Sequence, residues 1–147
     1  PYTYQNGVFL FPFKAVPKGR PRLAINMEVL RLAISSRDIS MAIRAFTITT
    51  PSKTRVFEKE LHLAFLDAIR THDLAIFESH ARVEIAIYHA SKKHGDIDNE
   101  AKSILDAMNG TFFEDDKSVS QLEVWRAYAD HECFQVKVCK IIERINL

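Results

Sequence analysis

Two stretches of the chain place apolar residues at helical spacing, at positions i, i+4, i+7, i+8 and i+11. The first stripe consists of Phe57, Leu61, Ala64, Phe65 and Ala68, and the second of Ile97, Ala101, Ile104, Leu105 and Met108. Each stripe predicts an amphipathic helix with one face on the core. Thr50-Pro51 supplies an N-cap and a first-turn proline for the earlier helix. Asn109-Gly110 supplies a left-handed end for the later one.

Strand patterns surround these two helices. Val83, Ile85 and Ile87 alternate with more polar residues, which predicts a strand with one buried face. Other β-prone runs are residues 7–13, 45–50, 119–128 and 134–142. The short connection from Ala129 to Cys133 predicts an antiparallel hairpin between the last two runs. Residues 23–43 have no clean period and predict little.

These elements predict an α+β fold in one compact domain, residues 1–147, with a small mixed sheet packed against two main helices. A chain of 147 residues with 47% hydrophobic content is long enough to bury one core. We expect the clustered phenylalanines and Trp125 to lie in that core. The apolar runs are far shorter than the roughly 20 residues that span a bilayer, so no membrane association is expected.

The two cysteines bear on the compartment. Cys133 and Cys139 fall in one predicted strand, where they would lie about 20 Å apart and could not form a disulfide with each other. Free thiols are expected in a reducing compartment, and we expect a cytoplasmic protein. Neither the cysteines nor the histidines have zinc-site spacing.

The formal net charge of +1 conceals an asymmetry. Residues 1–70 carry 11 Lys or Arg and 5 Asp or Glu, a balance of +6, and residues 71–147 carry 9 and 14, a balance of −5. A polyanion-binding protein with an acidic cation site would need such a division. On charge alone, ordinary solvated surfaces are the simpler interpretation.

The acidic half contains the residues that suggest chemistry. Asp96 and Asp98 precede or open the second helix, and two carboxylates at i and i+2 can converge on a hard divalent cation such as Mg²⁺. Asp98, Lys102 and Asp106 are spaced by four and share one ridge of that helix. The loop beyond it supplies residues 114–116, three further carboxylates, from which a third ligand could come.

Two alternatives to a Mg²⁺ site account for the same carboxylates. An EF-hand beginning at Asp96 would need glycine where Ala101 stands and glutamate where Ala107 stands, so that motif fails. A purely structural role stays open: Asp96 or Asp98 caps the helix, Asp98 pairs with Lys102, and residues 114–116 form a solvated turn. From the residues alone this structural role is the favoured interpretation.

The same residues, taken together, resemble a known motif. The runs DIDNEAK (96–102), DAMNG (106–110) and DDKSV (115–119) resemble the core pattern of the RusA family of Holliday junction resolvases, D-x-D-N-x-x-K followed by D-A-L and D-D-x-x-V. The basic run PKGRPR (17–22) and the helix start TPSKT (50–54) are also similar to phage-related members. The resemblance implies that Asp96, Asp98 and Asp116 bind metal and that Lys102 is the essential lysine.

The resemblance also implies an activity. A RusA-like chain would be an endodeoxyribonuclease that uses Mg²⁺, with Mn²⁺ as a substitute, and that resolves four-way junctions by paired symmetric nicks in recombination and repair. A two-fold junction matches a homodimer, which the resemblance also implies. An apolar side on either late strand could form the dimer seam or belong to the core.

We predict that DNA is contacted by basic residues outside the acidic site, namely Lys18, Arg20, Arg22, Lys92 and Lys93. Two rival functions use the same residues differently. A Mg²⁺-dependent nuclease of flaps or forks would need the same carboxylates. A DNA-binding module without catalysis would not need an acidic triad beside Lys102.

Overall fold

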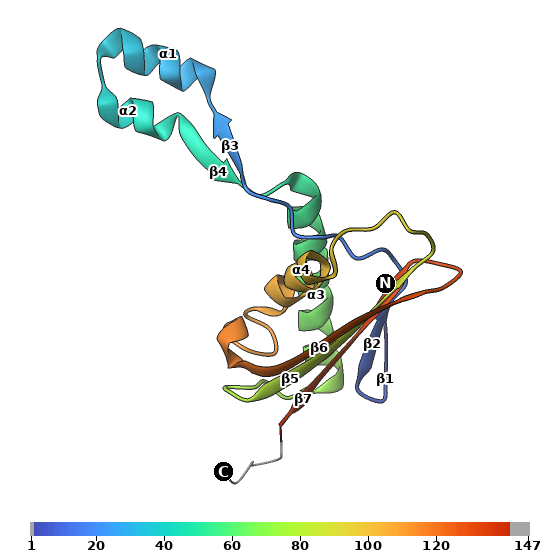
Figure 1. Ribbon diagram of the computed structural model, residues 1–147. Helices are drawn as coiled ribbons and strands as arrows, with labels where there is room; N and C mark the ends of the chain where they lie inside the picture. The colour runs from blue at the N-terminus through green and yellow to red at the C-terminus, as the bar shows by residue number, and fades with distance from the viewer. Residues whose placement is uncertain (1, 142–147) are drawn as a thin grey trace, which may run out of the picture.

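The computed structural model describes residues 2–141 and contains a five-stranded mixed sheet (Figure 1). Its order is β1-β2-β7-β5-β6, with only the β5–β6 pair parallel. The strands are β1 (Thr3–Gln5), β2 (Val8–Phe11), β5 (Ala81–His89), β6 (Val119–Tyr128) and β7 (Cys133–Lys140). The predicted mixed α+β fold is confirmed.

Helices α3 (Ser52–His72) and α4 (Ile97–Met108) lie on one face of this sheet, as Figure 1 shows. Both predicted helices are confirmed, with small differences at their ends. Pro51 occupies the N-cap of α3, so the predicted cap Thr50 lies one residue outside it. Beyond α4, Asn109 is extended and only Gly110, at φ +72°, adopts the left-handed conformation.

Aromatic side chains fill the space between the helices and the sheet. Phe11 of β2 stacks on Phe134 of β7 with ring centroids 4.8 Å apart, and Phe9 meets Phe65 of α3 edge to face at 5.4 Å. All four are almost fully buried, which accounts for the β2–β7 pairing and the docking of α3. Trp125, by contrast, is 44% exposed on edge strand β6, so the expectation that it lies in the core is wrong.

The predicted hairpin between the last two strands is also wrong. β5 lies between β6 and β7, and Ile85 pairs with Val124 on one side and with Val136 on the other. The buried side chains of β5 extend over its whole length, and a central strand of this kind needs a neighbour on both edges. The short connection from β6 to β7 therefore passes over the end of β5. The burial of β5 on both sides, and not the length of this connection, determines which strands pair. The last predicted residue of that run, Ile142, lies outside the described residues.

Residues 22–49 form an arm that projects from the body (Figure 1). It consists of the two-stranded ribbon β3 (Arg22–Ile25) and β4 (Phe46–Thr49), with α1 (Met27–Ser36) and α2 (Ile39–Arg44) at its tip. The β4 run was predicted, but the two helices were not. Within the arm helices only Ala33 is buried. Helices that bury so little do not need a continuous apolar stripe, which is why the sequence pattern did not reveal them. Their starts are marked by the side-chain caps Asn26 and Asp38.

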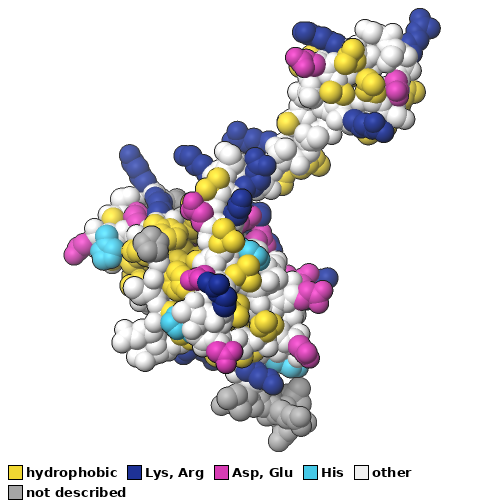
Figure 2. Space-filling model, turned by 180° about the vertical axis from the view of Figure 1, so that it is seen from behind, with side chains coloured by type: hydrophobic (Ala, Val, Ile, Leu, Met, Phe, Trp, Pro, Cys, Tyr) yellow, Lys and Arg dark blue, Asp and Glu magenta, His cyan; other side chains and the backbone are white. Residues whose placement is uncertain are grey.

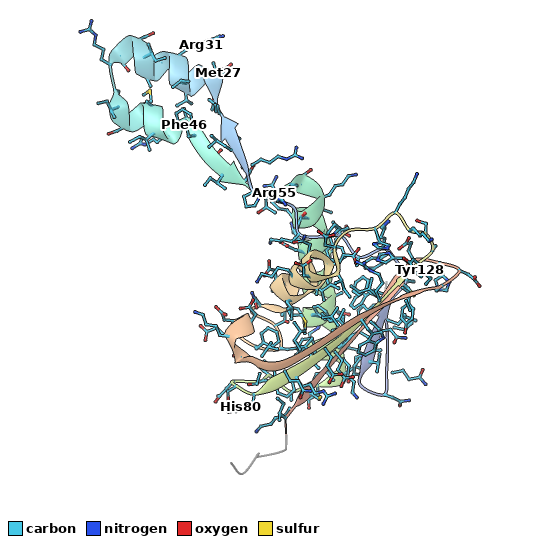
Figure 3. All side chains as sticks on the ribbon, viewed as in Figure 1. Met27, Arg31, Phe46, Arg55, His80 and Tyr128 are labelled. Carbon is cyan, nitrogen blue, oxygen red and sulfur yellow. The ribbon has the colours of Figure 1, made fainter. Side chains whose placement is uncertain are left out.

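One face of the ribbon is apolar and uncovered. The register pairs Leu23 with Ile48 and Ile25 with Phe46, and cross-strand pairs separated by two residues share a face. These side chains are between 44% and 78% exposed. Figure 2 shows hydrophobic side chains on the arm bordered by Lys and Arg, and Figure 3 places Met27, Arg31 and Phe46 there. A two-stranded ribbon of this kind is only marginally stable in water by itself.

Two further expectations concern β7 and the membrane. Cys133 and Cys139 are both free, as predicted. Within residues 2–141, no helix combines the length and the apolar character needed to cross a bilayer.

The loop that precedes α4 is held by close packing. A Cβ added to Gly95 would lie 2.8 Å from two ring carbons of Pro17, and one added to Gly19 would lie 2.4 Å from Pro51. The Ser103 hydroxyl also donates to the carbonyl of Val16. The segment around residues 16–19 therefore lies tightly over the beginnings of α3 and α4.

This packing generates a stability prediction. Gly95→Ala should lower the free energy of unfolding by about 1–3 kcal/mol, because the proline ring cannot move aside without displacing the segment. Urea denaturation would measure it. Lys92→Ala, an exposed change in the same loop, is the control and should stay within about 0.5 kcal/mol. An equal stability for the two variants would show that the contact is not restrictive.

Candidate active site

Asp96 and Asp98 lie where the chain turns from β5 into α4. Asp96 is the N-cap residue, with φ −72° and ψ 140°, and its carbonyl accepts the first helical hydrogen bond from Glu100 at 3.0 Å. Its carboxylate makes no cap hydrogen bond. Both aspartates are exposed, and within residues 2–141 neither carboxylate forms a hydrogen bond or an ion pair. Negative charge at the start of a helix interacts favourably with the positive end of the helix dipole.

Lys102 lies one helical turn beyond Asp98 but does not pair with it. Its Nζ lies 2.8 Å from Asp106 of the same helix and 2.8 Å from Asp116. Hydrogen bonds to these two carboxylates raise the pKa of Lys102 above its ordinary value. Asp116 opens the short 3₁₀ helix η1 (Asp116–Ser118), which leads directly into β6. Lys102 is therefore a fixed positive charge between α4 and this turn.

A second lysine continues the ion-pair chain. The Nζ of Lys18 lies 2.7 Å from Glu58 of α3 and 2.7 Å from Asp106, and its backbone N–H donates to the carbonyl of Asn99 at 2.7 Å. Although partial burial opposes the charge, the hydrogen bonds to Asp106 and Glu58 outweigh it and raise the pKa of Lys18. The segment of residues 16–19 is thereby joined to the same residue that holds Lys102.

The site carries an excess of negative charge. Within residues 2–141, Glu58, Asp106 and Asp116 pair with the ammonium groups of Lys18 and Lys102, whereas Asp96 and Asp98 pair with neither. Carboxylate oxygens are the donors that Mg²⁺ and Mn²⁺ prefer. The donor chemistry and the unpaired state of Asp96 and Asp98 therefore fit a divalent cation.

The structure does not bring the three predicted ligands into one cluster. No group of three His, Cys, Asp or Glu side chains within residues 2–141 is arranged to hold a metal ion. Asp96 and Asp98 lie together on the first turn of α4, whereas Asp116 is joined to them only through Lys102. The three-carboxylate site stays a prediction, and Asp96 and Asp98 are the residues most available to bind metal.

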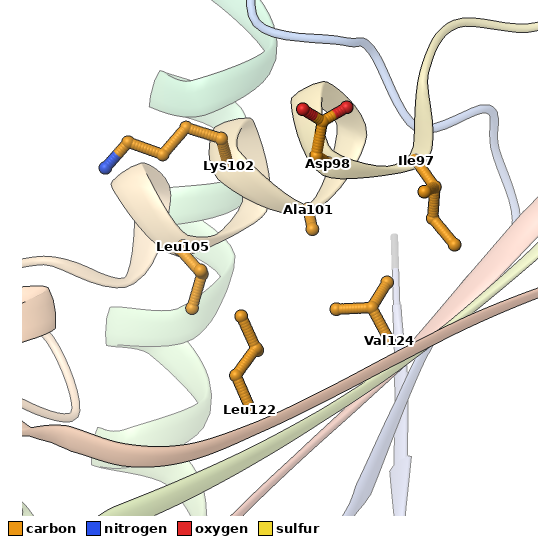
Figure 4. A pocket seen from close by; sticks show the side chains of 7 residues that line it. All are labelled: Ile97, Asp98, Ala101, Lys102, Leu105, Leu122 and Val124. Carbon is orange, nitrogen blue, oxygen red and sulfur yellow. The ribbon is translucent and has the colours of Figure 1, made fainter.

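An apolar groove borders the acidic residues. It has a volume of about 340 Å³ and lies between α4 and β6, with Asp98 and Lys102 at its rim and Ile97, Leu105, Leu122 and Val124 among the residues that line it (Figure 4). Figure 4 shows the polar ends of Asp98 and Lys102 directed away from the apolar floor of this groove.

Four of the five predicted DNA-contacting residues are exposed, and the fifth, Lys18, is ion-paired. Arg20 and Arg22 are exposed where the arm joins the body, and Lys92 and Lys93 are exposed in the loop before Asp96. Lys18 is different, because its ammonium is already bound by two carboxylates. A phosphate contact by Lys18 would compete with these two ion pairs.

Three acidic residues around the site were not predicted in their observed roles. Asp106 shares a helix ridge with Lys102, and this spacing could have identified it as the partner of the lysine. Glu58 could not have been found in this way, because it comes from another helix. Glu100 was also missed, although its charge on the apolar side of α4 was a visible signal; it is completely buried.

Comparison with protein families matches residues 12–139 to Endodeoxyribonuclease RusA, a span that includes every candidate site residue. A search of curated proteins gave no match. The matched span covers most of the 147-residue chain and agrees with the motif that carries Asp96, Asp98, Lys102 and Asp116. The chain therefore belongs to the RusA family of endodeoxyribonucleases, enzymes that hydrolyse DNA.

Proposed function

We propose that this protein is a Mg²⁺-dependent endonuclease that resolves Holliday junctions by paired symmetric nicks in recombination and repair. The observation that carries the proposal is the arrangement at the start of α4, in a chain of the RusA family. There, Asp96 and Asp98 are unpaired, and Asp98 stands one turn from Lys102, which is fixed by Asp106 and Asp116.

In this proposal Asp96 and Asp98 hold the cation, and Asp116 is the third acidic residue. Bound Mg²⁺, or Mn²⁺ in its place, supplies Lewis-acid stabilisation of the scissile phosphate and lowers the pKa of a bound water. Lys102 places its positive charge near the phosphate, where it stabilises the charge that develops during cleavage. Asp106 and Asp116 both bond the ammonium of Lys102, and together they fix the position of this side chain.

The substrate is tested with a synthetic four-way junction, a matched duplex and a flap, each incubated with Mg²⁺ or with EDTA. We expect symmetric nicks in the junction alone, and only with Mg²⁺, because the charge on the scissile phosphate needs the cation. Gel analysis of end-labelled strands reads out both the cut and its symmetry. Preferential cutting of flaps or forks would favour the rival branched-DNA nuclease.

The same assay tests the metal residues with Asp98→Asn. This change should abolish nicking while the junction is bound with nearly wild-type affinity, because binding depends on basic residues elsewhere. Asp73→Asn, at the exposed C-terminal end of α3, is the matched control and should cleave normally. Equal loss of binding and cleavage in Asp98→Asn would contradict the assignment.

For DNA contact we propose the exposed residues Arg20, Arg22, Lys92 and Lys93, with Lys18 retained as an ion-pair partner. The two arginines lie where the arm leaves the body, and Figure 2 shows Lys and Arg side chains gathered around that junction. A phosphate backbone passing from the arm to the acidic site would meet them. The lysines of the neighbouring loop would extend the contact.

Replacing Arg20 and Arg22 with alanine should reduce the slope of log affinity against log salt by about 1.8, since each lost phosphate contact contributes about 0.9. Junction binding measured by fluorescence anisotropy from low to moderate salt gives this slope. Arg70→Ala is the control, because Arg70 is exposed on α3 and already paired with Asp67. A slope that stays at the wild-type value in the double variant would make Arg20 and Arg22 ordinary surface charges.

We further propose that the active form is a homodimer, in which a second copy of the chain covers the apolar ribbon face of the arm. The two-fold symmetry of a four-way junction calls for two equivalent sites. The four large apolar side chains of this face are between 44% and 78% exposed. A stable dimer buries about 800 Å² or more of each partner, and the projecting arm offers an uncovered apolar surface from which such an interface can be built.

Changing Leu23 and Ile48 together to serine should convert the dimer to a monomer at micromolar concentration, because the ribbon face would lose two of its four large apolar side chains. Sedimentation velocity measures the association state, and a thermal melt checks that the body stays folded. Ala24→Ser, on the opposite ribbon face, should leave the dimer intact. A wild-type protein that sediments as a monomer at every concentration would overturn this part of the proposal.

A further inference from the structure

A buried ionic network lies directly beneath the turn that carries Asp96 and Asp98. Its centre is Glu100 of α4, whose side chain is completely buried. Glu100 Oε2 accepts a hydrogen bond from Arg126 of β6 at 2.9 Å and lies 3.1 Å from His89 Nε2 at the end of β5. The network therefore joins the three elements that meet at this end of the sheet.

Arg126 also reaches the backbone just before the first aspartate. The same terminal nitrogen that bonds Glu100 donates to the carbonyl of Gly95 at 2.6 Å. Gly95 precedes Asp96, and Glu100 lies one turn inside the helix. Arg126 therefore ties together the two ends of a six-residue segment, and both candidate metal ligands lie within it.

The network continues to the beginning of the same loop. His89 Nδ1 lies 2.8 Å from Glu132, which also accepts a hydrogen bond from the backbone N–H of Ala90 at 3.3 Å. The ring of His94 stacks on that of His89 with centroids 4.6 Å apart, and its Nε2 lies 3.1 Å from the hydroxyl of Tyr128. Figure 3 places Tyr128 at this end of the sheet. The loop is thus held at both ends by polar contacts.

Stability alone is a poor reason for this network. Burying a charged pair costs desolvation energy, and apolar residues of similar size often stabilise a protein as well or better. In addition, Glu100 Oε1 and Arg126 Nε are buried without a hydrogen-bond partner among the described residues, which costs free energy. What the charged groups provide, and apolar groups could not, is a directional bond to the Gly95 carbonyl.

We propose that Glu100 and Arg126 are positioning residues that hold the Gly95–Glu100 segment so that the carboxylates of Asp96 and Asp98 converge on one divalent cation. The inference rests on the proposed function, because it assumes that these aspartates bind metal. Neither residue touches the cation or the DNA. They act through the backbone on which the two ligands are carried.

The test measures Mn²⁺ affinity directly, by electron paramagnetic resonance titration of the protein without DNA. Arg126→Met should weaken Mn²⁺ binding by about 10–100-fold, the range typical of residues that orient metal ligands. Arg126→Lys keeps the charge and a nitrogen that can donate to both acceptors, but on a shorter side chain, and should recover part of the affinity. Glu100→Gln keeps the shape and should show a smaller loss.

In junction cleavage at saturating DNA, the same variants should lower kcat at limiting metal, and excess metal should restore it.

Arg82→Met is the matched control. Arg82 forms ion pairs with Glu84 and Glu123 on the sheet, but among the described residues it has no contact with the turn before α4. Its loss should leave Mn²⁺ affinity unchanged even if it lowers the melting temperature. Arg126→Lys and Glu100→Gln are the milder changes, and they keep the test decisive if Arg126→Met fails to fold.

The outcomes separate this inference from the proposed function. Folded Arg126 and Glu100 variants with wild-type Mn²⁺ affinity and wild-type kcat would overturn the positioning role while leaving the nuclease assignment intact. A wild-type protein that neither binds Mn²⁺ nor cleaves a junction would overturn both. Weakened metal binding in these variants, with normal binding in Arg82→Met, supports the proposal.

Discussion

The docking of α4 against α3 and the sheet is the constraint on which the site depends. Ile104, Leu105 and Met108 are buried in the shared core, and burying these side chains fixes the rotation of the helix about its axis. Once that rotation is fixed, Asp98, Lys102 and Asp106 must lie along the outward ridge. The side chains of the candidate site are therefore positioned by apolar residues of the core.

The ion pairs of the site determine which charged side chains are already bonded within the protein and which are not. Asp106 bonds both Lys18 and Lys102, so it joins the segment of residues 16–19 to the lysine of the site. Asp96 and Asp98 have no such partners among the described residues. This separation leaves the two carboxylates of Asp96 and Asp98 without a protein partner and holds the Lys102 ammonium between Asp106 and Asp116. It also explains why Lys18, although basic, is a weaker choice for a DNA contact than Arg20.

Two features of the molecule differ from ordinary burial of apolar side chains. The arm exposes an apolar ribbon face that its own two helices leave uncovered, and exposed apolar faces of this kind are typical of interaction surfaces. The Glu100–Arg126 network buries charge where apolar packing would cost less desolvation energy. Its charged groups provide a directional hydrogen bond to the Gly95 carbonyl, which apolar side chains could not. In both places the chain departs from the arrangement that would best stabilise an isolated monomer. Such departures are typical of functional surfaces and sites.

The sequence by itself determined the elements whose side chains repeat with a period: α3, α4, β5 and the mixed α+β class. It also placed Asp98, Lys102 and Asp106 on one helix ridge, because helical spacing is a local property. Only the tertiary structure decided that β5 separates β6 from β7, that Lys102 bonds Asp106 and Asp116 instead of Asp98, and that Glu58, Glu100 and Arg126 support the site. These contacts join residues from different elements, and their formation depends on burial and charge pairing across the fold, which no local spacing records.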